Sequence, residues 1–200
     1  MSSPRALPVI LASSSPRRRD ILARAGVRFE VLAPDVPEER LPAEAPESFA
    51  QRVAVAKALE VARKVGGEPR RTVIGADTIV VLDGEVLGKP RDAREARSHL
   101  RRLAGRHHRV LTAVAVIDSQ TLGVRATVVE SAVAMHPASE EEIAAYVATG
   151  EPLDKAGAYA AQGEGRRFVD RIEGSETNVI GLPLEEALAL LREVGSLGEA

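Results

Sequence analysis

The stretch VILASSSPRR, residues 9–18, joins an apolar run directly to a helix start. The run Val9–Ala12 is expected to form a buried strand. Ser15 is a preferred N-cap residue, Pro16 suits the first helical position, and Gly26 suits the residue just past the helix end. A strand that turns into a helix in this way points free backbone N–H groups and the positive end of a helix dipole at one spot. The stretch therefore predicts a site for an anion such as phosphate.

Two arginines, Arg17 and Arg18, lie at the start of the predicted helix and add full positive charge at the same place. A guanidinium group can donate two parallel hydrogen bonds to a phosphate. The alternative is a well-capped amphipathic helix whose arginines face water. On this stretch alone both interpretations stay open, so the rest of the chain has to decide between them.

Strand and helix patterns alternate along the rest of the chain. Further strands are expected at residues 29–32, 72–75, 79–82, 85–87, 109–117, 124–135 and 167–172, and further helices at 47–64, 92–104, 139–150 and 183–194. The caps and turns expected in them are Asp92, the capping box of Ser139 and Glu142, and the hairpin turn Asp83-Gly84. A Pro- and Glu-rich loop over 34–46 precedes the second helix.

The order mixes βα units with antiparallel hairpins, so we expect an α/β fold with a mixed β-sheet flanked by helices. Two hundred residues with 44% apolar content suit one domain over residues 1–200. Within that domain, a central cleft between two lobes is an alternative to a single undivided core.

Composition excludes several classes of protein. The net charge of −2 argues against a general basic surface for nucleic acid, and 2% aromatic residues argue against single-strand stacking. The chain has no cysteine, which excludes disulfides, thiolate metal sites and a cysteine nucleophile. No apolar run approaches the roughly 20 residues of a membrane helix, and Met1–Arg5 leads into too short an apolar stretch for a signal peptide. We expect a soluble cytoplasmic protein without nucleic-acid or membrane partners. A homodimer, the commonest assembly, is allowed.

Three further segments place polar residues in apolar or small-residue surroundings. Asp77 lies between two apolar runs, where an acid is costly unless it is paired or bound to a metal. Lys89 follows a glycine at the end of a predicted hairpin, and Gln162 lies in the segment 154–165, whose small residues allow close backbone approach to a ligand. Each also has a plain structural interpretation: a turn-forming acid, a solvated loop lysine and a flexible linker.

Taken together, these side chains form a chemically consistent set. The cations that could neutralise a polyphosphate are Arg17, Arg18, Lys57 and Lys89. Asp77 could act as a base or hold a metal, and the Gln162 amide could donate and accept hydrogen bonds at a nucleobase. The set fits metal-assisted attack of water on a phosphoanhydride.

Six segments carry these residues in order along the chain. They are Ser13–Arg18, Gly75–Thr78, Leu87–Pro90, Gly105–His108, Asp154–Tyr159 and Gly181–Pro183. In this order they resemble the successive motifs of the Maf family, over a match from about residue 8 to residue 190. Proteins of that family are nucleoside triphosphate pyrophosphatases, which release a nucleoside monophosphate and pyrophosphate. The resemblance implies this hydrolase activity on a nucleoside triphosphate, a divalent Mg or Mn cofactor, and an elongated Maf or inosine-triphosphatase-like fold.

Three positions resemble the branch of the family that acts on dTTP and UTP: Arg17, Thr78 and Gln162. In the 7-methyl-GTP branch these positions resemble an aromatic residue, Gln and Glu instead. Uracil and thymine present an acceptor–donor–acceptor edge, which Gln and Arg side chains can meet. The resemblance thus implies dTTP, UTP and related modified pyrimidine triphosphates as substrates. Ala160-Ala161 and Glu176 depart from the family pattern and bear on this preference.

The resemblance also implies roles for individual residues. Asp77 is the implied catalytic proton acceptor and a metal ligand, and Glu38 is the implied second metal ligand, with the adjacent Glu39 left open. The implied substrate-binding residues are Ser13, Ser15, Arg17, Arg18, Lys57, Thr78, Lys89 and Gln162. His107 and His108 are neighbours that would face opposite sides of a strand, so we do not expect them to share a metal ion.

The sequence leaves two other functions open. One is a pyrophosphatase of other noncanonical nucleotides, such as 7-methyl-GTP. The other is a non-catalytic nucleotide-binding regulator of septum formation, since the family has been linked to that process. The main expectation is a house-cleaning enzyme of the nucleotide pool with a link to cell-division arrest.

Overall fold

The computed structural model describes residues 8–197. The strands are β1 (Val9–Ala12), β2 (Phe29–Val31), β3 (Thr72–Leu82), β4 (Glu85–Leu87), β5 (His107–Asp118), β6 (Val124–Met135) and β7 (Val169–Glu173). The α-helices are α1 (Pro16–Arg24), α2 (Pro46–Val65), α3 (Ala93–Leu103), α4 (Glu140–Ala148), α5 (Glu176–Ile180) and α6 (Leu184–Glu193). Three 3-10 helices follow α4, namely η1 (Glu151–Asp154), η2 (Ala156–Ala158) and η3 (Gly163–Phe168).

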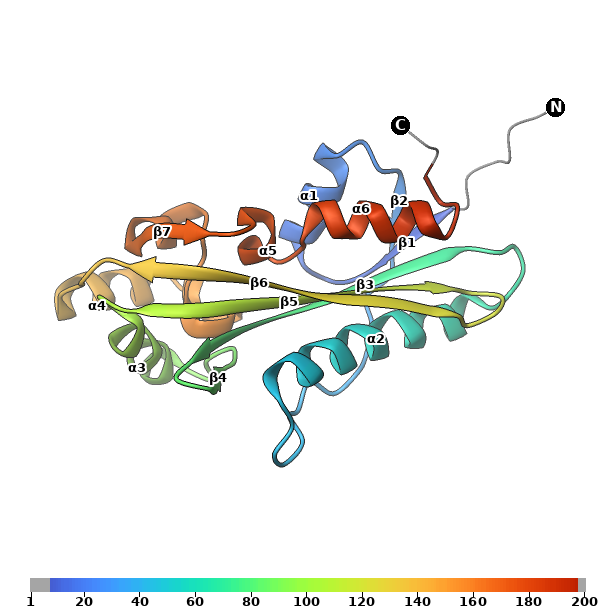
Figure 1. Cartoon of the computed structure of the whole chain (residues 1–200). Coiled ribbons are helices and arrows are strands. Elements are labelled where there is room, and N and C mark those ends of the chain that lie inside the picture. The colour runs from blue at the N-terminus through green and yellow to red at the C-terminus, as the bar shows by residue number, and fades with distance from the viewer. Residues whose placement is uncertain (1–7, 198–200) are drawn as a thin grey trace. The chain divides into compact units, whose positions relative to one another are not determined.

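The strands of the described residues form one seven-stranded sheet flanked by helices (Figure 1). The order across the sheet is β2-β1-β3-β5-β6-β7, and β4 pairs with β3. Parallel pairs (β1 with β2 and β3) and antiparallel pairs (β3 with β4, β6 with β7) both occur, which confirms the predicted mixed sheet. No helix within residues 8–197 is long and apolar enough to cross a membrane, and Met1–Arg5 lies outside the described residues.

The chain divides into two compact units. Unit 1 comprises Met1–Asp77, Thr112–Val128 and Gly181–Ala200, and unit 2 comprises Thr78–Leu111 and Val129–Ile180. Neither unit is a continuous stretch of chain, because β3, β5 and β6 each contribute residues to both. The boundary in β3 falls between Asp77 and Thr78.

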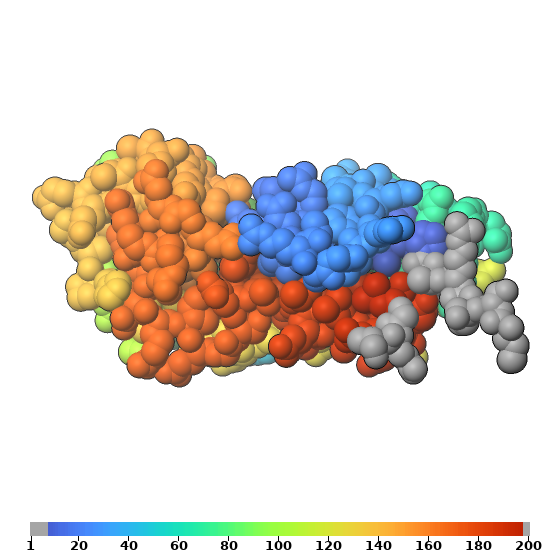
Figure 2. Space-filling model, turned by 90° about the horizontal axis from the view of Figure 1, so that it is seen from above, coloured from blue at the N-terminus to red at the C-terminus, as the bar shows by residue number. Residues whose placement is uncertain are grey.

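In unit 1 the opening stretch folds as its sequence predicts. Ser15 caps α1 by accepting a hydrogen bond from the Arg18 backbone N–H, Pro16 is the first helical residue, and Gly26 follows the helix at φ 74°. α1 and α6 lie side by side on one face of the sheet, and α2 covers the opposite face (Figures 1 and 2). A buried hydrogen bond of 2.8 Å from Arg18 Nε to the Gly181 carbonyl joins α1 to the segment before α6.

Helix α2 packs unusually close to β3. Alanines spaced four residues apart, and therefore on one face of the helix, are fully buried: Ala50, Ala54, Ala58 and Ala62. A Cβ atom at Gly75 of β3 would lie 2.8 Å from the Ala54 carbonyl oxygen and 2.9 Å from the Ala58 backbone nitrogen. Glycine is therefore required at Gly75 by the close approach of the helix, not by its backbone torsion.

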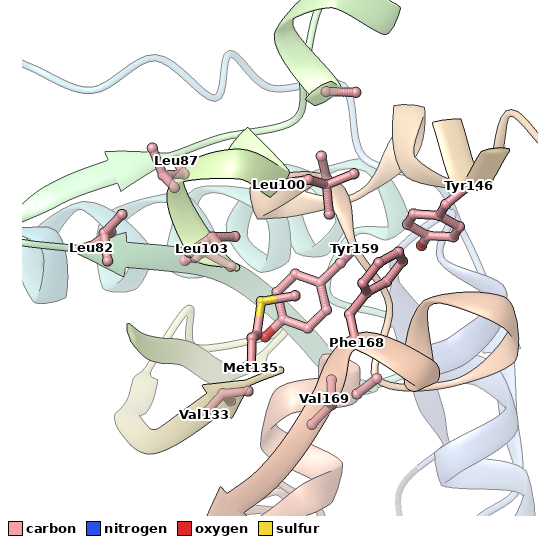
Figure 3. Close-up of a cluster of buried hydrophobic side chains, with 14 of the residues drawn as sticks. Leu82, Leu87, Leu100, Leu103, Val133, Met135, Tyr146, Tyr159, Phe168 and Val169 are labelled. Carbon is pink, nitrogen blue, oxygen red and sulfur yellow. The ribbon is translucent and has the colours of Figure 1, made fainter. Parts of the chain in front are cut away.

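Unit 2 is organised around a second apolar core. α3 packs against α4 and η2, and the side chains between them include Leu100, Leu103 and Tyr146 (Figure 3). The Tyr146 and Phe168 rings lie 5.1 Å apart between centroids, tilted by 52°. This core holds the segment between α4 and β7 against the sheet.

Several local predictions are confirmed. The caps by Asp92 and Ser139 are present, the latter as a complete capping box with Glu142. Asp83 and Gly84, at φ 52° and 81°, make the turn between β3 and β4. Positive φ at both central residues is the requirement of a tight hairpin turn, which Asp-Gly meets readily.

Other predictions about the elements are wrong. The runs 72–75 and 79–82 are not two strands, because β3 continues through Asp77 with neighbours on both sides in the sheet. The segment before the last helix contains α5 where a loop was expected, and β7 begins at Val169, two residues later than predicted. The alternative interpretation of the segment 154–165 as a flexible linker does not hold either, since its backbone forms 3-10 turns around buried alanines.

The packing of α2 on β3 predicts that Gly75→Ala is destabilising. The added methyl group meets backbone atoms that cannot rotate away, so the helix has to move, at a cost of about 1–3 kcal/mol. Thermal or urea unfolding of the purified variant measures this loss. Gly67→Ala is the matched control, because the nearest atom to its Cβ would be Gln120 Cα at an ordinary 3.6 Å. Equal stabilities of the two variants would contradict the proposed packing constraint.

Candidate active site

A buried ion pair lies at the centre of the candidate site, and all of its residues belong to unit 1. Lys57 Nζ donates to Asp77 Oδ1 at 2.7 Å and forms an ion pair with Glu38 Oε1 at 2.7 Å. Lys57 comes from α2 and Asp77 from β3. Glu38 comes from the Pro- and Glu-rich loop over residues 34–46, which we call the acidic loop. The Lys57 and Asp77 side chains are only 7% and 8% exposed, whereas that of Glu38 is 39% exposed. The Lys57 ammonium thus lies between the two carboxylates that the family resemblance implies as metal ligands.

Charge and burial act against each other at Asp77. Burial raises the pKa of the Asp77 carboxyl, while the Lys57 ammonium and the Arg18 guanidinium oppose that rise. Burial also lowers the pKa of Arg18, and the charges of Asp77 and Glu38 oppose this change. The effect of burial is the larger one, so the Asp77 carboxylate is a stronger base than a carboxylate in water. The Lys57 and Arg18 charges beside it could also interact with an anionic ligand.

The acidic loop is fixed by an arginine that the sequence did not single out. Arg52 of α2 donates from Nε to Glu44 Oε1 at 2.7 Å and from NH2 to Glu44 Oε2 at 2.8 Å. The same NH2 group donates to the Glu39 carbonyl at 2.8 Å. Because the backbone of Glu39 is anchored on Arg52 while the Glu38 carboxylate meets Lys57, the structure favours Glu38 over Glu39 as the carboxylate of the site.

The turn before α1 is organised by its own serines. Ser13 Oγ accepts hydrogen bonds from the Ser15 backbone N–H at 3.1 Å and from Arg18 NH1 at 3.3 Å. Arg18 is buried, Arg17 is half-buried and Ser14 is exposed. Arg17 and Arg18 therefore differ in environment, although they are neighbours in the sequence.

The remaining predicted site residues lie in unit 2. Thr78 is half-buried in β3, while Lys89 and Gln162 are exposed in loops. The Gly157 N–H donates to the Gly88 carbonyl at 3.1 Å, so the segments that carry Lys89 and Tyr159 lie against each other. The structure thus brings together two of the sequence motifs within this unit.

His108 is a core residue of unit 2. It is 3% exposed, and its Nε2 shares a 2.7 Å hydrogen bond with the Tyr159 hydroxyl. Burial, with a smaller effect of His107, lowers the pKa of His108 to about 4. His107 is exposed on the other side of β5, so the two histidines do not face one ion, as expected.

The carboxylates of Asp77 and Glu38 fit a magnesium-type ion. No cluster of three or more His, Cys, Asp or Glu side chains suited to a metal occurs within residues 8–197. Magnesium, however, is usually held by one or two carboxylates together with substrate phosphates and water. Two carboxylates within 2.7 Å of the same Lys57 nitrogen supply such a partial ligand set.

Comparison with known proteins places this architecture in a family. A family model described as Maf-like protein matches residues 8–194. The chain belongs to the Maf family. This Maf protein is 51% identical over 189 residues to a protein named dTTP/UTP pyrophosphatase from Geobacter sulfurreducens, with 94% of this chain and 97% of the relative covered. It is also 51% identical over 193 residues to a protein of the same name from Burkholderia thailandensis, with 92% and 91% covered.

A solved structure supports the fold of this Maf protein. A HAM1 protein from Coxiella burnetii aligns with a TM-score of 0.50 at 12% identity, over 95% of this chain and 97% of the other. At this identity the likeness concerns the fold alone. It agrees with the expected α/β architecture.

The sequence did not reveal what two residues contribute to the site: Gly75, which was noted only as part of the segment Gly75–Thr78, and Arg52. Gly75 precedes Asp77 by two residues and so lies on the same face of β3, which lets α2 bring Lys57 close to Asp77. The alanines at four-residue spacing in α2 were the available signal for this approach. Arg52 had no such signal, because its partner Glu44 lies in an irregular loop.

The environment of His108 predicts a loss of stability in mild acid. Its pKa is about 4 in the folded protein against 6.5 ordinarily, so the unfolded chain binds more protons between these values. The stability contributed by the neutral imidazole is complete above pH 6.5 and falls by roughly 3 kcal/mol by pH 4. His108→Gln, which still offers Tyr159 a hydrogen-bond partner, should flatten this dependence in urea unfolding between pH 7 and 4.5. His107→Gln should keep the wild-type slope, and a wild-type slope in His108→Gln would refute the assignment.

Proposed function

We propose that this Maf protein is a nucleoside triphosphate pyrophosphatase that hydrolyses dTTP and UTP to the monophosphate and pyrophosphate. The observation that carries the proposal is the buried Asp77 carboxylate on Lys57, with the charges of Arg18 and Glu38 close enough to affect it. The names of the relatives that are 51% identical support the same substrates. Such an enzyme would remove these triphosphates, or modified pyrimidine nucleotides, from the nucleotide pool.

In the proposed reaction, water attacks the α-phosphorus of the triphosphate. Asp77 accepts the proton of that water, the bond from the α-phosphorus to the oxygen bridging to the β-phosphorus breaks, and pyrophosphate leaves. Because Lys57 engages Oδ1, we assign the proton to Oδ2. The raised pKa of Asp77 makes it a better proton acceptor than a solvated carboxylate.

Cations and backbone donors would stabilise the charge of the triphosphate. We assign this role to Arg18, Lys57 and Lys89, together with the N-terminus of α1, where Ser13 and Ser15 shape the turn. Asp77 and Glu38 would hold a divalent cation, Mg or Mn, which when bound would supply further positive charge at the phosphates.

Selection of the base is assigned to Arg17, Thr78 and Gln162. Side chains of Arg and Gln can meet the acceptor–donor–acceptor edge of uracil and thymine without a charge on the base. A carboxylate at the position of Gln162 would instead suit a cationic 7-methylguanine. This distinction favours pyrimidine triphosphates over the alternative substrate.

We also propose a cytoplasmic location and a homodimeric assembly for the enzyme. A chain without cysteine needs no oxidising compartment, which agrees with the location. The dimer is proposed on the general frequency of this assembly, and light scattering of the purified protein measures it.

Nucleotide specificity and the role of Asp77 can be tested in one assay. Release of pyrophosphate is followed for UTP, dTTP, CTP, ATP, GTP and 7-methyl-GTP, with and without Mg or Mn. UTP and dTTP should be the best substrates, and Asp77→Asn should lower their rates by about 100-fold or more. Asp118→Asn, which alters another buried acid paired with an arginine, should keep its activity per folded molecule.

Three results would contradict parts of the proposal. A near wild-type rate for Asp77→Asn would exclude its role as proton acceptor. Preference for 7-methyl-GTP would overturn the base assignment. Tight triphosphate binding without turnover in the presence of Mg or Mn would favour the non-catalytic regulator.

The position of Glu38 predicts a specific change in metal dependence. Glu38→Gln should raise the Mg or Mn concentration needed for half-maximal activity by about tenfold, because it removes one of two charged ligands. Glu39→Gln changes the adjacent residue in the same way and should leave that concentration unchanged, since only its backbone carbonyl is used. Titration of the EDTA-treated proteins with either metal measures both values, and binding of Mn without substrate, followed by calorimetry, gives a readout independent of turnover. Equal metal dependence in the two variants would refute the choice of Glu38.

A further inference from the structure

A carboxylate outside the proposed site residues organises the loop that carries Gln162. Glu151, in η1, accepts a hydrogen bond at Oε1 from the Gly165 backbone N–H at 3.0 Å. Its Oε2 accepts one from the Glu164 backbone N–H at 3.2 Å. The Tyr146 hydroxyl donates a third, to Oε1, at 2.9 Å. All of these residues and Gln162 belong to unit 2.

The turn after Gln162 closes tightly on this carboxylate. Gly163 has φ 66°, and a Cβ atom there would lie 2.9 Å from Glu151 Oε2. A Cβ atom at Gly165 would lie 2.7 Å from both the backbone nitrogen and the carbonyl oxygen of Ala160. The glycines on either side of Glu164 therefore allow the loop to fold back on itself and to surround the Glu151 oxygens with N–H groups.

The other side of Gln162 is anchored separately. Tyr159 is buried and its hydroxyl meets His108 Nε2 at 2.7 Å, among the side chains of the unit 2 core (Figure 3). Ala160 and Ala161, which follow Tyr159, are also buried. Gln162 itself is exposed, so its side chain projects from a backbone that is held on both sides.

The carboxylate of Glu151 is suited to holding this turn and unsuited to donating a proton. Burial acts to raise its pKa, but the hydrogen bonds from Tyr146, Gly165 and Glu164 outweigh burial and keep the pKa below its ordinary value. Tyr146, Glu164 and Gly165 all donate to Glu151, and an ionised carboxylate can accept these three hydrogen bonds better than an amide can. A glutamine at this position would have one acceptor oxygen and would direct an NH2 group at a donor.

We propose that Glu151 is a positioning residue for base selection, whose carboxylate holds the turn Gly163–Gly165 and thereby fixes Gln162 for contact with the uracil or thymine edge. The inference rests on the proposed function, because it assigns a task to the residue proposed to select the base. Glu151 itself does not touch the substrate. Its effect reaches the base only through the conformation of the loop.

The test compares UTP with CTP, which have the same size but different hydrogen-bonding edges. The ratio of kcat/KM for the two substrates, measured on one preparation, does not depend on the fraction of folded enzyme. Glu151→Gln should lower this ratio about threefold to tenfold, mainly through a higher KM for UTP, because Gln162 loses its preorganised position. Hydrogen exchange of the Glu164 and Gly165 amides should become faster in the same variant.

Glu164→Gln is the matched control, because it removes a carboxylate from the same loop. Glu164 contacts Glu151 through its backbone N–H, which the substitution keeps. It should keep the wild-type ratio and exchange rates. Tyr146→Phe removes one of the three donors to Glu151 and should lower the ratio by less than Glu151→Gln. If Glu151→Gln does not fold, Tyr146→Phe alone decides.

Each outcome bears on one proposal. An unchanged ratio in Glu151→Gln, or an equal loss of activity on UTP and CTP, would overturn the positioning role and leave the proposed function standing. Failure of the wild-type enzyme to prefer UTP and dTTP would show in the first measurement and would overturn the proposed function instead. In that case, the ratio of kcat/KM between the preferred nucleotide and a poorer one, measured for wild type and Glu151→Gln, tests whether Glu151 affects base selection by this loop.

Discussion

The pairing of Lys57 with Asp77 is the constraint on which the rest of unit 1 depends. Both residues are buried, and each charge needs an opposite charge beside it, because an isolated buried ion loses its hydration without compensation. The pair requires α2 to lie close to β3, which the buried alanines and Gly75 make possible. Lys57 in turn fixes the Glu38 carboxylate. Stability and the arrangement of the reactive groups thus have the same physical origin.

Local rules predicted the parts of the fold in which neighbours along the chain determine the structure. The N-cap at Ser15, the capping box at Ser139 and the Asp83-Gly84 turn each depend on contacts within a few residues. The continuity of β3 through Asp77 does not, since it requires adjacent strands and a cation from α2. A polar residue in an apolar run was therefore interpreted as a possible turn, although the sheet places it inside a strand.

The candidate site shows the same division between local and distant contacts. Residue types marked Asp77 and Lys57 as reactive, and the family resemblance connected them with Glu38. Our proposal of Glu38 over Glu39 rests on the contacts of Arg52 with Glu44 and with the Glu39 carbonyl, and these two glutamates lie in an irregular loop with no repeating pattern. The many small residues in 154–165 suggested a flexible linker. Small residues make a backbone flexible only when no other group binds that backbone. Here Glu151 binds it from outside that segment.

The interleaving of the two units along the chain has a consequence for how the protein is made. Unit 1 draws on Thr112–Val128 and on residues from Gly181 onward, in addition to the first 77 residues. During synthesis from the N-terminus, the Arg18 guanidinium emerges long before the Gly181 carbonyl that accepts its buried hydrogen bond. All residues of unit 2 have been made once Ile180 is added. Unit 1, which contains the first residues of the chain, is therefore completed after unit 2. The side of α1 that faces α6 (Figure 1) is therefore covered only after the residues from Gly181 onward have been made.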